Sequence, residues 1–191
     1  MKSKRLMAVS AAAVVFLSLS GTAQAGGGGG GGVCSDATLK GAFAVSAHGT
    51  LLGLLDSNNT LHPFATPSTL DDVALITFDG RGMFTRIDYG NVNGAPKGGP
   101  DFTGNQRGAY SVKSNCTGTM TVVYDNGTIL NLQMVVADDG TVIKAIIATE
   151  IVTTAGPTTP PLPQPCSPDC HVGVQVSFDG KKVFTHGDHD R

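Results

Sequence analysis

The chain has 191 residues and a formal net charge of −2, with 13 Lys and Arg residues against 15 Asp and Glu residues. After position 25 the basic residues are spread singly apart from Lys181-Lys182, so the clustered positive charge that binds nucleic acid is missing and we expect no nucleic-acid partner. No apolar run after position 25 approaches the length of a membrane-spanning helix, so we also expect no membrane span.

Positions 1–25 have the three-part layout of a secretory signal peptide. Basic residues within 2–5 precede an apolar stretch over 6–19, and Ala23-Gln24-Ala25 supplies the small residues of a cleavage site. A membrane anchor is the alternative, but the stretch has only about 14 residues and two serines interrupt it. We expect cleavage after Ala25 and a secreted or periplasmic protein that begins with a glycine-rich, flexible tether over 26–33.

Positions 34–154 have the composition of one β domain. Short runs rich in Val, Ile, Thr, Phe and Tyr are separated by Gly, Asn and Asp, and Asp79-Gly80, Asn126-Gly127 and Asp139-Gly140 each predict a hairpin turn. About eight such strands predict an all-β fold, an antiparallel up-and-down β-barrel, with a β-sandwich as the alternative. The expected strands are 39–48, 51–55, 73–78, 83–90, 105–113, 117–124, 128–137 and 141–152, with long connections over 56–71 and 91–103.

The C-terminal part predicts a spacer and a further hairpin. Six prolines within 155–168 indicate an extended, stiff segment, so 155–171 is expected to be a Pro-rich spacer. Positions 76–86 (ITFDGRGMFTR) align without gaps on 176–186 (VSFDGKKVFTH). The repeat predicts that 172–191 forms a second hairpin of the same kind, followed by a polar tail.

Four cysteines in an exported chain predict two disulfides, for which three connectivities exist. We prefer Cys34 with Cys116 and Cys166 with Cys170. The first pair would tie the start of the domain to a central hairpin, and the second would close a small local loop inside the spacer.

Four short motifs carry a family resemblance: CSDATLKGAF at 34–43, ITFDGRG at 76–82, GAYSV at 108–112 and NCTGT at 115–119. They resemble a group of exported bacterial proteins of unknown function that is itself similar to the allene oxide cyclase barrel, a calycin-like fold. The resemblance covers roughly 34–152 and implies a barrel. An isomerase or cyclase activity would rest on this resemblance alone, because no residue matches a cyclase catalytic site and a fold does not define a function.

Arg86, Asp88 and Glu150 are the candidate ligand-binding residues. Arg86 and Asp88 share a strand face with Phe84; inside a barrel they would grip a polar ligand, but an ordinary charge pattern on the outer face is the simpler interpretation. Glu150 is the only glutamate in the chain. Alternation places it on the face of Lys144, where a surface ion pair is the simpler interpretation and a position in the lumen is the alternative.

The sequence contains no recognisable set of nucleophile, base and orienting group, and this favours a protein without enzymatic activity. His186, Asp188 and His189 in the tail are a weak candidate for loose metal binding, although a solubilising polar end is the simpler interpretation. We expect no resident cofactor.

Two functions of different kinds fit this pattern. The first is a secreted, non-catalytic barrel that binds a small apolar or amphipathic molecule or serves as a stable module; an interior completely filled by side chains would exclude the ligand. The second is an extracellular assembly or surface protein, whose C-terminal hairpin adds to the sheet edge of a neighbouring copy.

Overall fold

The computed structural model describes residues 34–163, 166 and 168–184, which are mostly β-strand. The predicted signal peptide and glycine tether, and the polar tail after residue 184, lie outside the described residues. Within the described part of the chain, no helix is long and apolar enough to cross a membrane.

The described chain consists of antiparallel strands and two short 3₁₀-helices, η1 (Asp36–Thr38) and η2 (Asp138–Gly140). The strands are β1 (Lys40–Leu55), β2 (Leu61–Asp79), β3 (Met83–Val92), β4 (Ala95–Pro96), β5 (Thr103–Val112), β6 (Thr117–Val123), β7 (Ile129–Ala137), β8 (Val142–Val152) and β9 (Cys170–Lys182).

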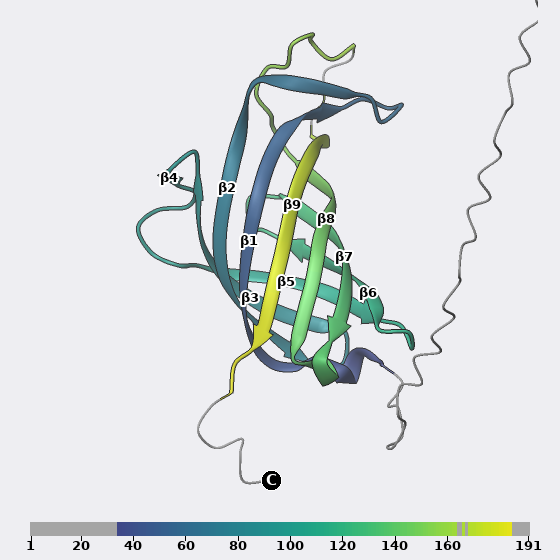
Figure 1. Ribbon diagram of the computed structural model, residues 1–191. Coiled ribbons are helices and arrows are strands. Elements are labelled where there is room, and N and C mark those ends of the chain that lie inside the picture. Colours follow the sequence, from purple (N-terminus) through teal and green to yellow (C-terminus); the bar gives the residue numbers. More distant parts are fainter. Residues whose placement is uncertain (1–33, 164–165, 167, 185–191) are drawn as a thin grey trace, which may run out of the picture. The chain divides into compact units, whose positions relative to one another are not determined.

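Eight of these strands close into a ring, in which β1, β9 and β8 lie side by side and β3, β5 and β6 cross behind them in the view of Figure 1. Around the ring the order is β1, β2, β3, β5, β6, β7, β8 and β9, and β9 pairs again with β1. Because each strand pairs with its neighbours in the chain and the last pairs with the first, the fold is an antiparallel up-and-down β-barrel. The predicted fold class is confirmed.

The side-chain alternation and the turn residues explain why the chain folds in this way. Alternate residues of β7, from Leu130 to Val136, are buried inside the ring, while the residues between them are more exposed. At the three predicted hairpin turns Gly80, Gly127 and Gly140 have φ angles of +79°, +85° and +82°, which glycine adopts without steric cost.

One end of the barrel interior is filled by aromatic side chains. The ring of Phe78 makes edge contacts with the rings of Phe43 and Tyr110, at centroid distances of 5.3 and 4.9 Å. The Tyr110 hydroxyl lies 2.9 Å from the backbone oxygens of Asp36 and Leu39, so it holds η1 against this end. These aromatic side chains belong to the buried hydrophobic core.

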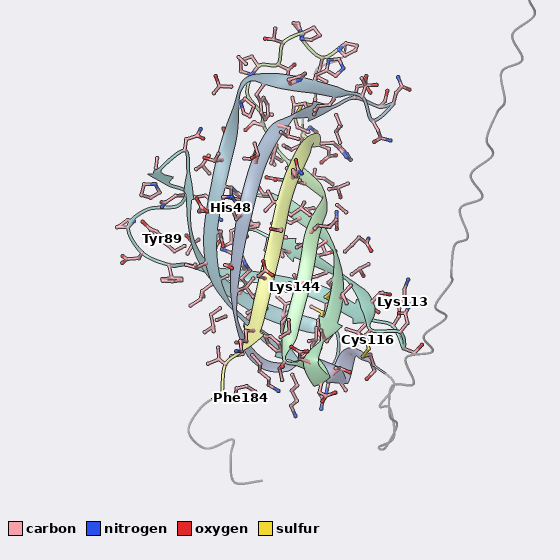
Figure 2. The ribbon with its side chains drawn as sticks, in the orientation of Figure 1. His48, Tyr89, Lys113, Cys116, Lys144 and Phe184 are labelled. Carbon is pink, nitrogen blue, oxygen red and sulfur yellow. A yellow bond between two sulfur atoms is a disulfide. The ribbon has the colours of Figure 1, made fainter. Side chains whose placement is uncertain are left out.

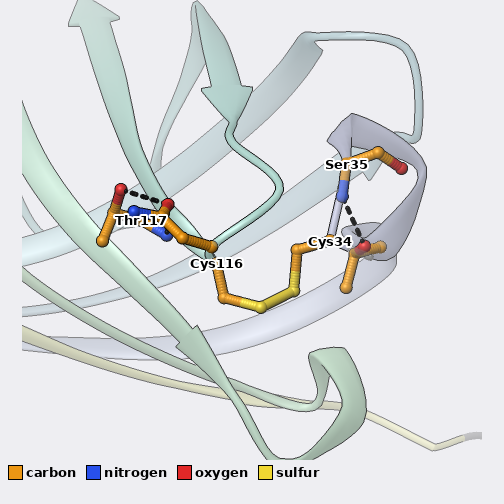
Figure 3. The surroundings of a disulfide bond; sticks show 6 residues. Cys34, Ser35, Cys116 and Thr117 are labelled. Atoms are coloured by element: carbon orange, nitrogen blue, oxygen red, sulfur yellow. Dashed lines mark hydrogen bonds between the residues drawn. A yellow bond between two sulfur atoms is a disulfide. The ribbon is translucent and has the colours of Figure 1, made fainter. Parts of the chain in front are cut away.

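Both preferred disulfides are present. Cys34 is bonded to Cys116, 82 residues away, and the bond joins the segment before η1 to the turn between β5 and β6 (Figure 3). Cys166 is bonded to Cys170. Two structural disulfides are consistent with a protein that matures outside the reducing cytoplasm.

Two of the predicted segment boundaries are wrong. The separate strands expected at 39–48 and 51–55 form the single strand β1, and most of the connection expected at 56–71 belongs to β2. The first part of β2 contains Pro63 and Pro67 and therefore resembles a loop in sequence. Until Leu70 its only strand partner is β1, and on the other edge it makes no more than an isolated bridge between Phe64 and Thr158, so this part tolerates proline.

The C-terminal hairpin is also wrong, because 170–182 is the single strand β9, paired with β1 on one side and β8 on the other. In the first copy of the repeat, Asp79 accepts hydrogen bonds from the backbone N–H groups of Arg81 and Met83 at 2.7 and 3.0 Å and makes a turn. In the second copy Gly180 is part of the strand and lies against Val45. Pairing on both edges keeps this copy extended.

Candidate functional site

The other half of the barrel interior is a cavity of about 290 Å³. Its polar and apolar groups come from different parts of the ring. Most of its apolar wall belongs to β1, β7, β8 and β9, and includes Leu51, Leu130, Ile147 and Phe178. Most of its polar wall belongs to β2, β3, β5 and the residue that follows β6, and includes Asp72, Arg86, Asp88, Gln106 and Tyr124.

Arg86 is the centre of the polar wall, and only 2% of its surface is exposed. Its Nη1 donates to Asp88 Oδ2 at 2.9 Å and to the Tyr124 hydroxyl at 2.7 Å. The same nitrogen donates to Gln106 Oε1, and Nη2 donates to Asp72 Oδ1 at 2.7 Å. The guanidinium is thereby held between two buried carboxylates.

The register of β2 and β3 brings these groups together. Arg86 and Asp88 are two positions apart on β3 and therefore both point inward. Asp72 on β2 lies opposite Gly90 on β3. A Cβ atom at Gly90 would come within 2.7 Å of Asp72 Oδ2, so the missing side chain provides the space that the Asp72 carboxylate occupies.

Lys97 is the second cation of the site, and sequence reasoning missed it because it lies in the expected connection over 91–103. A small hairpin carries it: Asn93 and Gly94 have φ angles of 52° and 79°, and the Lys97 N–H donates to the Gly90 carbonyl at 2.7 Å. Its Nζ donates to Asp72 Oδ2 at 2.6 Å and Asp88 Oδ2 at 2.5 Å. In the sequence, the Asn93-Gly94 pair was the feature that indicated this hairpin.

The two carboxylates differ in their protonation. Burial raises the pKa of Asp88, but the nearby charges of Arg86 and Lys97 outweigh burial and hold it at about 2. For Asp72, burial is the larger effect and its pKa lies above the usual range, although the same two cations offset part of the shift. Asp88 is thus the permanently charged partner of the two cations.

This difference predicts a specific loss of stability in acid. Because its pKa is lower in the folded state, Asp88 contributes about 2 kcal/mol above pH 4, and this is lost as the pH falls towards 2. Asp72 has a raised pKa in the folded state, so its effect on stability is the opposite: it favours the folded protein more as the pH falls. Urea unfolding at pH 7 and pH 2.5 should therefore show a smaller acid-induced loss in Asp88→Asn than in the native protein.

The matched control for this measurement is Asp71→Asn, because Asp71 is an exposed carboxylate next to Asp72 in the chain. Asp56 and Asp79 also have lowered pKa values, caused first by backbone hydrogen bonds, and keep their acid sensitivity in both variants. An equal acid-induced loss in Asp88→Asn and Asp71→Asn would contradict the role given to Asp88.

Glu150 lines the same cavity, on β8. Simple alternation placed it with Lys144, which lies on the outer surface (Figure 2). A β-bulge changes the alternation: Asn131 of β7 pairs with Thr149 but Leu132 pairs with Ile147, so one residue of β8 has no partner. After the bulge Glu150 is turned to the inside.

Glu150 makes no hydrogen bond or ion pair with any residue that the structure describes within the range 34–184. Burial raises the pKa of this carboxyl group, and the charge of Lys97 offsets only part of the increase. Tyr124 also keeps its proton at neutral pH, because burial raises the pKa of its hydroxyl. The cavity therefore offers a free carboxyl group and a phenol.

The candidate residues thus converge on one place. Arg86, Asp88 and Glu150 all line the cavity, and the simpler interpretation that they lie on the outer surface was wrong. His186, Asp188 and His189 lie outside the described residues, among which no group of three metal-ligating side chains occurs.

The fold and the site define a closed, eight-stranded antiparallel β-barrel with an amphipathic cavity in one half of its interior. No protein-family model matches the chain, and comparison with curated proteins and with solved structures finds no match either. A relationship to the allene oxide cyclase barrel therefore stays a prediction from the four short sequence motifs.

Proposed function

We propose that this protein is an exported, non-catalytic barrel that is released by cleavage after Ala25 and binds a small amphipathic molecule in its interior. The half-filled barrel is the observation that supports this most directly. Aromatic side chains close one end, while the other end leaves a cavity of about 290 Å³ between an apolar and a charged wall. A barrel that served only as a rigid module would have no need of this space.

The size of the cavity limits the ligand. An engineered cavity of about 150 Å³ accommodates benzene, so a cavity of this volume fits a molecule of about a dozen non-hydrogen atoms. The apolar wall favours a hydrocarbon or aromatic part, and the opposite wall favours a polar group. An amphipathic ligand matches both.

The buried charges also support a binding function rather than a structural one. Replacing a buried ion pair by well-packed apolar side chains is often neutral or stabilising, so stability alone does not explain why Arg86, Asp72 and Asp88 line this interior. Strongly shifted pKa values in a cavity are typical of functional sites.

The other hypotheses have weaker support. The assembly hypothesis required a free C-terminal hairpin, whereas β9 pairs on both sides within its own barrel. An isomerase or cyclase remains a weaker proposal that depends on the family resemblance alone.

The test is native mass spectrometry of the protein purified from its own periplasm or medium, before and after denaturation. We expect a non-covalent mass that is lost on denaturation, whereas a bare barrel would leave a structural module as the better description.

The variant Ala47→Leu tests where the molecule binds, because Ala47 lines the cavity and the added carbon atoms would occupy it. The bound fraction should fall at least tenfold.

The matched control is Ala44→Leu, which makes the same change at an outward-facing position of β1. This variant should keep its bound mass. Equal occupancy in both variants would show that the molecule binds somewhere other than the barrel interior.

A further inference from the structure

The charges around the cavity do not balance, and this points to a class of ligand for the binding function proposed above. Among the described cavity-lining residues, Arg86 and Lys97 are both paired with Asp72 and Asp88. Glu150 is the third carboxylate and has no partner within the described part of the chain. When it is ionised, the cavity wall has one uncompensated negative charge.

The neighbouring strands do not neutralise this charge, and Lys97 offsets only part of it. The register partners of Glu150 on the two neighbouring strands are Leu130 on β7 and Val172 on β9, both buried apolar residues. In the ring of eight, β8 lies four strands from β3 in either direction, so Glu150 faces the strand of Arg86 across the lumen. Glu150 is half-buried, and a carboxylate that is partly removed from water without a partner costs free energy that a bound cation would recover.

The opposite wall adds a hydrogen-bond donor. The Tyr124 hydroxyl accepts a hydrogen bond from Arg86, and its own hydrogen has no acceptor among the described residues. A molecule lying between the two walls would meet an acceptor at Glu150 and a donor at the Tyr124 hydroxyl.

We propose that the cavity binds a small hydrophobic amine, whose protonated nitrogen pairs with the Glu150 carboxylate while its apolar part lies against Leu130, Ile147 and Phe178. An organic anion fits less well, because both cations are already paired and it would approach three carboxylates. A neutral alcohol would leave the Glu150 charge uncompensated. The ammonium group alone restores the balance of charge.

Three compounds of nearly equal size and shape test the ligand class. 2-Phenylethylamine, 2-phenylethanol and phenylacetate differ in charge but share an aromatic part that the cavity volume accommodates. Isothermal titration calorimetry at pH 7 should give the highest affinity for the amine. Since a hydrogen bond to a charged group contributes about 1.5–3 kcal/mol, Glu150→Gln should weaken the amine about tenfold to a hundredfold and leave the alcohol within about twofold.

The control Asp71→Asn removes one carboxylate from the outer surface and should leave all three affinities unchanged. Thermal unfolding of each variant establishes that it is folded. If the alcohol or the acid binds as tightly as the amine, or if Glu150→Gln does not weaken the amine, the ligand class is wrong while the binding function stands. If no compound binds and the purified barrel contains no bound mass, both proposals fail.

Discussion

Replacing Arg86 by methionine should lower the free energy of unfolding by about 3–5 kcal/mol at neutral pH. Methionine retains much of the volume of the side chain, but the change removes the guanidinium that donates to both Asp72 and Asp88. These two carboxylates are 6% and 1% exposed. Lys97 alone would then have to compensate both, and a buried charge without a partner is costly.

The control for this prediction is Arg107→Met, because Arg107 lies on the adjacent strand β5 but points outward and is exposed. It should change the stability by no more than about 0.5 kcal/mol in urea unfolding. Adding Asp72→Asn to Arg86→Met should recover part of the loss, since Lys97 then has Asp88 as its single partner and no carboxylate is left uncompensated. Equal effects of the two arginine variants, or no recovery, would contradict the electrostatic explanation.

The local features of the fold could be predicted because they depend on neighbouring residues. Alternation of apolar and polar side chains identified most strands, and the Asp-Gly and Asn-Gly pairs identified three turns whose glycines have positive φ. The cysteine count with an expected export signal led to the correct disulfides. For the strands and the turns, a short stretch of sequence contains the physical cause.

The features that were wrong depend on pairing between distant segments. The two copies of the FDG repeat are similar in sequence, yet Asp79-Gly80 forms a turn and Asp179-Gly180 continues a strand. The second copy remains extended because β1 and β8 need a strand between them to close the ring. No local pattern contains this requirement.

The candidate site illustrates the same limit. Arg86 and Asp88 were assigned to one strand face, but the sequence does not say which face is inside, and their charge favoured the wrong choice. For Glu150 the alternation itself failed, because the bulge near Thr149 shifts the pattern by one residue. Charged residues that break the local rules in this way are expected where a protein binds a ligand.

The two disulfides should contribute very unequally to stability, so the loss of one can be compared with the loss of the other in the same protein. Replacing Cys34 and Cys116 by alanine should cost about 4 kcal/mol, whereas the same change at Cys166 and Cys170 should cost about 2 kcal/mol. In the chain-entropy model the difference follows from the sequence separations of 82 and 4 residues, since a longer loop restricts the unfolded chain more.

Urea unfolding of the two double variants measures this difference directly. The long-range disulfide also holds the segment before η1 at the filled end of the barrel, where the Tyr110 hydroxyl bonds to backbone oxygens of Asp36 and Leu39. Its loss should therefore leave the cavity at the other end intact, and the folded fraction should bind 2-phenylethylamine with unchanged affinity. A loss of affinity with no loss of stability would instead mean that the filled end controls the cavity.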